Sequence, residues 1–411
     1  MLEIQFQAAR FSCTQGTEGV FGSVLERPVL GMSLAERQER AILLAWGAWA
    51  HEESKAKLWI REDVYVTSEA IEVFVKKAKE KPPGVYCFKA DGLFGGWLTD
   101  LMLGDTGPLM VWKSVGGPPS DEELEEAKDI IIPSKERVFP MPVSKAQFGA
   151  DILQIPLSDF VVVPTRHWLQ LLWCNLMGLA PFLWRELVGR KPVTAMWNLF
   201  KAFVRKPTFK FPVLFTALGR KGKGCQIHPS AVVEGSWLGE GVRIGANAVV
   251  RGCVLAEGAV VEDLALVEFS VLGEKALVQR QAMVKFSVLA ARSAAAGVMQ
   301  LGVLDQDAML KRGAYLMDMR LGESAKIKVD GELRKAPLGL AGCCVGARTI
   351  VGLGVRVAAG RYIPPDLHIV AAPEQTLIKI PERFANRAKQ DAEGEPIARA
   401  VSVKKGGLSL L

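Results

Sequence analysis

The sequence predicts an α/β domain in the N-terminal part of the chain and an all-β domain of stacked coils after it. Two observations predict this division. Between Ile227 and Leu321 the sequence repeats with a period of seventeen, in steps of six, six and five. Before residue 160, strand-like and helix-like runs alternate instead. A short fixed period indicates units that stack and bury one shared core, whereas alternating runs are typical of an α/β domain.

The first of these parts, residues 1–160, is expected to hold three helices. One begins at Ser33, which caps the amides that follow, while Glu36 completes a capping box. A second is expected at Ser68–Lys81, and the acidic patch 120–129 predicts a third, because acidic side chains are favourable near a helix N-terminus. The strand-like runs are Leu2–Ala8, Lys57–Val66, Gly84–Phe88, Pro108–Trp112 and Phe160–Val163.

A basic and aromatic connector, residues 161–224, is expected to be helical and to join the two domains. From Arg166 to Lys223 it holds eleven Lys or Arg and one acid, Glu186, so its formal charge is +10, whereas the whole chain carries +7. Residues 168–184 are all uncharged, but this run is short of the roughly 20 residues needed to span a bilayer. Three interpretations stay open for the connector: internal packing, contact with a membrane surface, and contact with nucleic acid. Nucleic acid is the least favoured, since no recognised binding motif accompanies the charge.

The membrane-surface interpretation depends on residues 195–205. Their pattern places Met196, Leu199, Phe200 and Phe203 on one helical face. Aromatic and basic residues on one amphipathic helix are typical of a helix lying on anionic lipid. The residues expected to contact the membrane are Trp197, Phe200, Lys201, Arg205, Lys206 and Lys210.

The coils are expected in residues 225–372, followed by a polar tail, 373–411. Nine consecutive steps from Leu238 onward begin with Leu, Ile or Val, and their fifth residue is always Ala or Val. One large and one small inward residue per step predict a three-sided prism with corners at the Gly and polar positions. The fifth residues are Val242, Ala248, Val254, Ala259, Ala265, Val271, Ala276, Ala282 and Val288.

Two irregularities interrupt the coils. Leu304 follows Leu289 at a spacing of fifteen, two short of the period, which predicts a tightened coil. After Ile327 the polar stretch KVDGELRKAP predicts a loop that leaves a corner, and strict steps of six resume from Val345 to Ile363. Because stacked strands rise about 4.8 Å per layer, roughly eight coils predict a prism about 35 to 40 Å long.

The repeats resemble the hexapeptide-repeat, left-handed parallel β-helix of bacterial acyltransferases and sugar nucleotidyltransferases. The steps LGEGVR and IGANAV fit the repeat of that family, and IHPSAVV (227–233) looks like its first coil. The family is commonly trimeric, so the resemblance implies a homo-oligomer, with a trimer favoured.

A second resemblance covers the N-terminal domain. RPVLGMSLAERQERAILLAWG (27–47) and LWIREDVYVTSEAIEVFVKKAKE (58–80) are similar to stretches of sugar-phosphate nucleotidyltransferases, many of which carry a hexapeptide β-helix after the catalytic domain. The resemblance implies a loop of Gly16, Gly19 and Gly22 that approaches a nucleotide phosphate, and Asp63 as a ligand of magnesium.

The catalytic loop itself departs from that family. Glu18 stands where a positive charge would help, and no Lys precedes Lys55. Because phosphoryl transfer depends on positive charge around the transferred group, the domain is expected to be degenerate. The alternative reading of Asp63 is a turn residue at the start of the next helix.

Acyl transfer on the β-helix is the alternative chemistry. Enzymes of that kind use a His as general base at a coil edge, and the chain has four His. His228 and His368 are the catalytic candidates, although each also fits a structural role. His167 is expected to start a helix and to pack, in a phrase similar to one that joins the two domains in related nucleotidyltransferases.

Cysteine usage and the beginning of the sequence bear on the cellular compartment. Seven Cys without regular spacing fit a reducing compartment better than a disulfide framework, and no CxxC pair suggests zinc. The beginning, MLEIQFQAARF, does not resemble a secretory signal, so a cytoplasmic protein is expected, with a peripheral place on the inner membrane surface as an option.

Three functions therefore stay open. The leading hypothesis is a sugar-phosphate nucleotidyltransferase-like protein, weakly active or non-catalytic, that acts as an oligomeric scaffold or regulator and binds a nucleotide-sugar. The alternatives are a hexapeptide-repeat acyltransferase and a structural assembly protein on a membrane surface. The only cofactor that the resemblance implies is magnesium.

Overall fold

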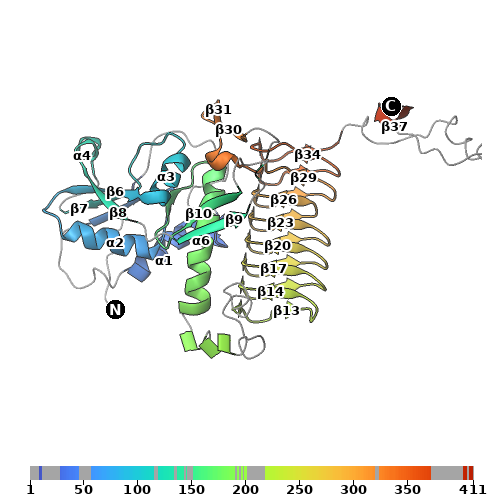
Figure 1. The fold of residues 1–411 in the computed structure, drawn as a ribbon, viewed down its shortest axis with the longest axis horizontal. Helices are drawn as coiled ribbons and strands as arrows, with labels where there is room; N and C mark the ends of the chain where they lie inside the picture. The colour runs from blue at the N-terminus through green and yellow to red at the C-terminus, as the bar shows by residue number, and fades with distance from the viewer. Residues whose placement is uncertain are drawn as a thin grey trace, which may run out of the picture.

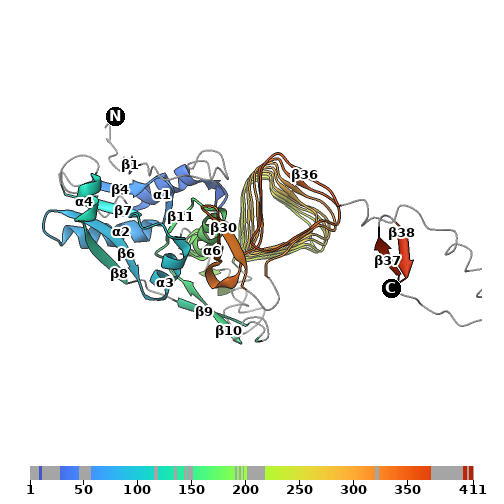
Figure 2. The same cartoon turned by 90° about the horizontal axis from the view of Figure 1, so that it is seen from above.

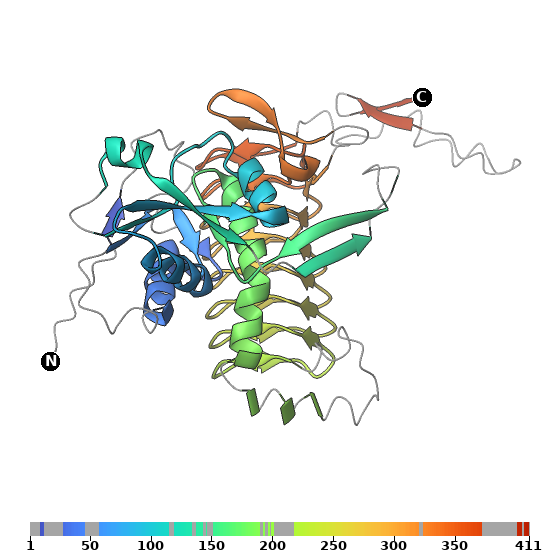
Figure 3. The same cartoon turned by 60° about the vertical axis from the view of Figure 1, so that its left-hand side comes forward.

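The computed structural model describes residues 9–11, 28–45, 57–114, 119–133, 137–142, 145, 151–189, 192–193, 196–197, 199–200, 218–319, 324–371, 401–404 and 407–410. It confirms the predicted fold class: a small α/β domain and a left-handed parallel β-helix lie side by side (Figure 1). Helix α6 (Trp168–Trp184) lies between them and runs along the β-helix (Figure 3).

The β-helix consists of three parallel sheets of eight, eight and seven strands, which form a triangular prism when viewed from above (Figure 2). In most coils the pairing of neighbouring strands follows the predicted period of seventeen, so Ile244 pairs with Val261 and Val261 with Val278. The first residues of the steps are buried in the prism, as predicted. We call the three sheets the helix face, the depression face and the third face.

The helix face contains β12 (Arg220–Lys221), β15 (Trp237–Leu238), β18 (Val254–Leu255), β21 (Val271–Leu272), β24 (Val288–Leu289), β27 (Val303–Leu304), β32 (Cys344–Val345) and β35 (Tyr362–Ile363). The depression face contains β13 (Gln226–Ile227), β16 (Arg243–Ile244), β19 (Val260–Val261), β22 (Leu277–Val278), β25 (Ala294–Ala295), β28 (Met309–Leu310), β33 (Ile350–Val351) and β36 (His368–Ile369). The third face contains β14 (Val232–Glu234), β17 (Val249–Arg251), β20 (Leu266–Glu268), β23 (Met283–Lys285), β26 (Val298–Gln300), β29 (Tyr315–Leu316) and β34 (Arg356–Val357).

The fifth residue of every step was predicted to point into the prism. For the five-residue steps this prediction is wrong. Neighbouring residues on a strand point to opposite sides of the sheet, so the residue directly before the inward Leu272 must point outward. That residue is Val271, and it packs in a core outside the prism, as do Val254 and Val288. The fourth residue of the step turns inward instead: Cys253 belongs to the interior, and the buried Ser270 and Ser287 follow it in the next two coils.

The short coil lies at the corner between β25 and β26. Val278 and Ala295 pair at the full period of seventeen, but Val284 and Met299 pair at a spacing of fifteen, so the shortening occurs at this corner. Gly297 occupies it, and a Cβ there would collide with the carbonyl oxygen of Ala314. The tightened coil is therefore confirmed, and it requires glycine at this position.

The predicted loop after Ile327 is instead largely a β-hairpin. Strands β30 (Lys326–Val329) and β31 (Glu332–Lys335) are antiparallel, and the 3-10 turn η4 (Pro337–Gly339) follows them. Asp330 and Gly331 join the strands with φ angles of 50° and 86°. Two successive positive φ angles at Asp-Gly are typical of a two-residue hairpin turn.

The α/β domain is built on a five-stranded mixed sheet in the order β1-β4-β7-β6-β8. Its central strand, β7, is antiparallel to both neighbours, whereas β1 pairs with β4 and β6 pairs with β8 in parallel. The five strands are β1 (Ala9–Phe11), β4 (Lys57–Arg61), β6 (Val85–Asp91), β7 (Met110–Lys113) and β8 (Lys128–Pro133).

Smaller strand pairs surround this sheet. They are β2 (Pro28–Val29) with β3 (Met32–Ser33), β5 (Val64–Val66) with β11 (Val162–Pro164), and β9 (Arg137–Pro142) with β10 (Ile152–Leu157). In the predicted tail, β37 (Val401–Lys404) pairs with β38 (Gly407–Leu410). The predicted strand Leu2–Ala8 lies outside the described residues, and the predicted run Lys57–Val66 is divided into β4 and β5 by a turn.

Two of the three predicted helices match closely. Helix α1 (Leu34–Ala45) starts after Ser33, whose hydroxyl accepts from the Glu36 amide at 3.3 Å, and α2 is Ser68–Lys79. Helix α4 (Asp121–Glu125) is shorter than predicted, because the chain enters β8 at Lys128. Helix α3 (Gly92–Leu101) was not predicted, since its three glycines are unfavourable inside a helix. Gly95 is needed there, because a Cβ would lie 2.7 Å from the carbonyl oxygen of Ala90.

Helix α6 joins both domains in one hydrophobic core. Its Trp173 meets Trp97 of the α/β domain edge-on, with ring centroids 5.0 Å apart, and its Phe182 meets Trp237 of the helix face at 5.9 Å. Val254, Val271 and Val288 belong to the same core. Residues 168–184 are therefore packed, and none of the described helices is long and apolar enough to cross a bilayer. A π-helical turn, η3 (Arg185–Gly189), follows α6.

Candidate functional site

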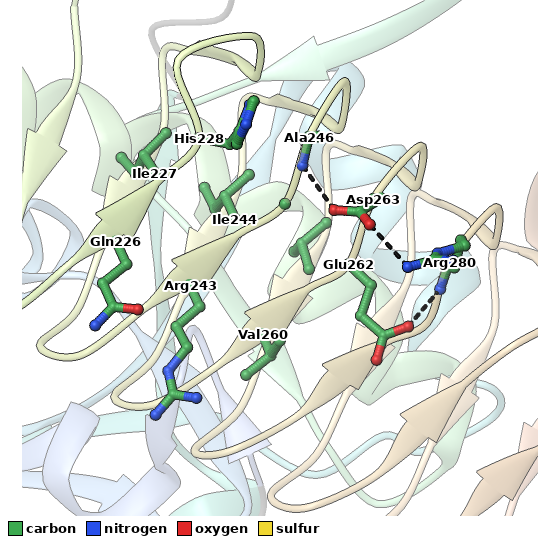
Figure 4. Close-up of a pocket in the computed structure, with 12 residues that line it drawn as sticks. Gln226, Ile227, His228, Arg243, Ile244, Ala246, Val260, Glu262, Asp263 and Arg280 are labelled. Carbon is green, nitrogen blue, oxygen red and sulfur yellow. Dashed lines mark hydrogen bonds and ion pairs between the residues drawn. The ribbon is translucent and has the colours of Figure 1, made fainter.

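An open depression of about 590 Å³ lies near the first coils of the β-helix, on the depression face (Figure 4). Its floor consists of β13, β16 and β19, and the corners that follow these strands form one side. Its charged and polar lining residues are Gln226, His228, Arg243, Glu262, Asp263 and Arg280. The parallel register brings these residues together, because each lies at a matching position of the next coil.

Hydrogen bonds fix the acidic side of the depression. The Asp263 carboxylate accepts from the backbone amide of Ala246 at 2.8 Å and from the Arg280 guanidinium at 2.9 Å (Figure 4). Glu262 accepts from the backbone amide of Arg280 at 2.8 Å. These contacts join three successive coils at one corner. Arg243 projects from β16 and is exposed to solvent.

His228 follows β13 and is exposed at the edge of the depression. Its Nδ1 atom lies 3.2 Å from the backbone amide of Ser230 and 2.8 Å from the Ser230 hydroxyl. A backbone amide can only donate, so Nδ1 of the neutral imidazole accepts and the proton lies on Nε2. Nε2 is then a donor. In a single chain His228 is set up to stabilise the first corner, and it would need the other tautomer to accept a proton from a substrate through Nε2.

His368 does not join this site. It lies on β36, the last strand of the depression face, whereas His228 follows β13, the first strand of the same sheet. His368 is exposed, and its strand pairs with β33. The two histidines predicted as catalytic candidates are therefore at opposite ends of the prism.

Asp63, the predicted metal ligand, is buried in a network of ion pairs. Its carboxylate accepts from the Arg61 guanidinium at 2.6 and 3.2 Å and from Nε of Arg166 at 2.8 Å. Asp105 also lies 2.7 Å from Arg61 and 3.5 Å from Arg166. Arg61 is wholly buried and Asp63 is 3% exposed. The carbonyl of Asp63 accepts from the amide and hydroxyl of Thr165, at 2.8 and 2.7 Å.

This network connects the α/β domain to the segment that leads into α6. Both carboxylates are already paired with the two guanidinium groups, and these positive charges next to Asp63 disfavour a divalent cation there, because like charges repel strongly in a buried site. Among the described residues, no group of three or more His, Cys, Asp or Glu is arranged to hold a metal ion. Sequence reasoning missed the role of Arg166, which it counted only toward the net positive charge of the connector.

The predicted phosphate loop, Gly16, Gly19 and Gly22, lies outside the described residues. The strand before it, β1, ends at Phe11, which pairs with Arg61 at the end of β4. The end of β1 therefore lies beside the Arg61–Asp63 turn.

The predicted membrane-contacting residues are described only in part. Trp197 and Phe200 are 55% and 56% exposed, and their rings stack with centroids 5.8 Å apart. Met196 is 69% exposed. Lys201, Arg205, Lys206 and Lys210 lie outside the described residues.

His167 caps α6, in agreement with its predicted packing role. Its Nδ1 accepts from the amide of Leu169 at 3.1 Å, so its Nε2 carries the proton and donates to the carbonyl oxygen of Lys328 at 3.1 Å. Burial lowers the pKa of this imidazole to about 4, against smaller opposing effects of the Lys328 carbonyl and Asp330. The hairpin β30–β31 is thereby tied to α6, and Arg334 ties it to the carbonyl of Leu103 at 2.8 Å.

Comparison with protein families gives no match, and comparison with curated proteins gives none either. Among solved structures, a hexapeptide transferase family protein from Anaplasma phagocytophilum is 11% identical over 36% of this chain and 75% of that chain, with a TM-score of 0.19. A proposed acetyltransferase from Bacillus cereus is 15% identical over 38% of this chain and 73% of that chain, with a TM-score of 0.18. At such low scores neither similarity bears on activity, and the coil geometry itself defines the class of fold.

Proposed function

We propose that this protein is a non-catalytic, oligomeric scaffold or regulator, in which a degenerate nucleotidyltransferase-like domain is joined to a hexapeptide β-helix. The observation that supports this proposal most is that the buried Asp63 is already engaged in ion pairs with Arg61 and Arg166. Its carboxylate oxygens are held by two arginines, so it acts as a structural link between β4 and the entry to α6. A magnesium ligand needs a carboxylate that can turn an oxygen toward the ion, usually together with substrate phosphates.

The continuous core supports the scaffold role. Residues of the α/β domain, α6 and the helix face belong to one hydrophobic cluster, so the two domains form one body rather than parts that open and close. The helix face is covered, which leaves the other two faces of the prism for self-association. The third face presents a row of half-buried apolar side chains, namely Val249, Leu266, Met283 and Val298. A closed homo-oligomer, with three chains favoured, would cover such a row.

Nucleotide binding tests this proposal directly. Calorimetric titration with nucleoside triphosphates and a nucleotide-sugar, with and without magnesium, should show no magnesium-dependent heat from the α/β domain. A regulator can still bind a nucleotide-sugar without magnesium. Magnesium-dependent binding together with release of pyrophosphate would overturn the proposal.

Acyl transfer at the depression is the second candidate, and one observation favours it. The depression places His228 and the exposed Arg243 on one open surface of about 590 Å³, large enough for a small substrate. Because the depression is open, a neighbouring chain of a homo-oligomer could supply a further wall for it. Turnover of acyl-coenzyme A that is lost in His228→Ala, and kept in the His368→Ala control at the other end of the sheet, would support this function over the scaffold.

Contact with an anionic membrane is the third candidate, supported by the exposed Met196, Trp197 and Phe200. It would place the protein at the inner face of the cytoplasmic membrane. Each basic residue near an anionic surface contributes about 1 kcal/mol, so changing Lys201, Arg205, Lys206 and Lys210 to Gln should lower partitioning nearly a thousandfold. Co-sedimentation with anionic vesicles at low and high salt measures this, and indifference of the native protein to vesicles at low salt would exclude it.

A further inference from the structure

A second, smaller pocket lies where α1, the start of α2 and the end of α6 meet. It is lined by three arginines: Arg37 and Arg40 come from α1, and Arg185 lies in the π-helical turn η3 that follows α6. Ser68 and Glu69 line it from the first turn of α2. Its enclosed space is about 20 Å³, which holds a single water-sized atom.

The lining is strongly positive. Three arginines and one acidic residue, Glu69, line the pocket, and the Glu69 carboxylate accepts from the Ser68 hydroxyl at 3.0 Å. Arg37 is only 6% exposed, and its Nε donates to the carbonyl of Val29 at 3.0 Å. Burial lowers the pKa of the Arg37 guanidinium to about 10. Arg40 and Arg185 act in the same direction, while Tyr65 and Glu186 oppose them. An anion in the pocket would relieve this crowding of positive charge.

The Arg185 guanidinium, which lines this pocket, has a hydrogen-bond donor without a partner among the described residues. Its Nη1 donates to the Ser68 hydroxyl over a long 3.4 Å. Its Nε is buried and has no hydrogen-bond partner within the described part of the chain. Leaving a buried donor of a charged group unpaired is costly, so native structures seldom keep one without a ligand, ion or water.

The start of α2 adds a third independent feature. Thr67 precedes the helix, but its side chain does not cap it, because the hydroxyl donates to the carbonyl of Asp159 at 2.8 Å and accepts from the amide of Val161 at 3.1 Å. The first turn of α2 therefore presents the positive end of a 12-residue helix to the pocket.

We propose that this pocket binds a phosphate group. One phosphate oxygen enters the enclosed space beside Nε of Arg185, and the rest of the group lies at the mouth, where the exposed Arg40 reaches it. Arginine suits this role because its planar donors match phosphate oxygens. The proposal does not depend on the scaffold function, since the pocket contains neither Asp63 nor His228.

The phosphate can belong to a small molecule or to a lipid headgroup. Large apolar side chains are exposed on the same helices: Leu43 and Leu44 follow Arg40 on α1 with 57% and 47% exposure, and Trp184 precedes Arg185 with 50% exposure. A lipid phosphate in the pocket would bring these side chains to the membrane interface. The experiment therefore has one arm for each source.

The first arm uses inorganic phosphate with the full chain. Calorimetric titration should show one site per chain, and the double variant Arg40→Gln/Arg185→Gln should bind at least tenfold more weakly. The control Lys76→Gln/Lys81→Gln removes the same charge from exposed positions on and after α2, and should change affinity less than twofold. Thermal unfolding of each variant without phosphate reports whether it folds.

The second arm uses phosphatidylcholine vesicles that contain phosphatidic acid, which offers a terminal phosphate, or phosphatidylserine, which does not. Co-sedimentation with phosphatidic acid that exceeds phosphatidylserine, and falls at least tenfold in the arginine variant, assigns the pocket to a headgroup. Binding in the first arm alone assigns it to a soluble phosphate compound. If neither ligand binds, or if the folded arginine and lysine variants bind equally, the proposal is wrong.

Discussion

Replacing Asp63 by Asn tests the structural role of the buried charge network. Asn keeps the shape of the side chain but removes the negative charge that faces Arg61 and Arg166. Arg61 is wholly buried, so it would retain only Asp105 as a charged partner. Removing one member of a buried ion pair typically costs about 3 to 5 kcal/mol, and the lower end applies here because Asp105 remains and Asn still accepts hydrogen bonds. We therefore expect a loss of about 3 kcal/mol in the free energy of unfolding.

The assay is urea denaturation followed by tryptophan fluorescence, with and without magnesium and with a chelator. The control is Asp129→Asn on β8 of the same domain, which breaks an ion pair between Asp129 and Lys89, whose side chains are 47% and 61% exposed. Surface pairs of this kind contribute little, so the control should unfold like the native protein. Magnesium should not change the result for any of the three proteins.

Two results would refute this reasoning. Equal stability of Asp63→Asn and Asp129→Asn would mean that the network contributes nothing to folding. Stabilisation of the native protein by magnesium, absent in Asp63→Asn, would mean that Asp63 binds the metal after all, and that the arginines release it when the ion is present.

Three further predictions concern the coils, the cap of α6 and self-association. Ile244→Asp should cost several kcal/mol because it buries an unpaired carboxylate, whereas Arg243→Asp, one residue earlier and outward, should cost under about 0.5 kcal/mol; equal melting temperatures would contradict the assignment. His167 has a lowered folded pKa of about 4, so the unfolded chain binds the extra proton, and stability should fall by at most about 3 kcal/mol as pH drops from about 6.5 to 4. The variant His167→Asn can still cap the helix but does not titrate in this pH range, so its stability should lack this loss. A pH profile of stability equal to that of the native protein would contradict the role assigned to His167. Sedimentation at micromolar concentration should show a homo-oligomer, most favourably a trimer, and a single species of the 44.7 kDa chain would exclude it.

The coils could be predicted in detail because each strand depends on a pattern a few residues long. Even the shortened coil follows from the spacing between Leu289 and Leu304. The orientation of Val271 could not be read from its own step. It follows from the position of Val271 directly before the inward Leu272. This outward side chain belongs to the same hydrophobic core as α6, although that helix ends far earlier in the chain, at Trp184. The hairpin at Lys326–Lys335 had a local signal, the Asp330–Gly331 pair, which the length of the polar stretch obscured.

The candidate site was less accessible to sequence reasoning because its contacts are distant. Asp63 follows a strand and precedes a helix, which suits a metal ligand and a structural anchor equally well. The residue that distinguishes them, Arg166, lies 103 positions later. Arg61, two residues before Asp63, was a nearer signal for an ion pair. His167 was assigned correctly, since a polar residue directly before a long apolar helix is most simply a cap.

The most direct test of the central proposal is an assay for pyrophosphate exchange with the native chain. Nucleoside triphosphates, sugar phosphates and magnesium are incubated with the protein, and radiolabelled pyrophosphate is followed into triphosphate. A non-catalytic scaffold predicts no exchange above the level of a protein-free control. Exchange that requires magnesium and disappears in Asp63→Asn would contradict the account, because it would show that the network around Asp63 opens to form a working metal site.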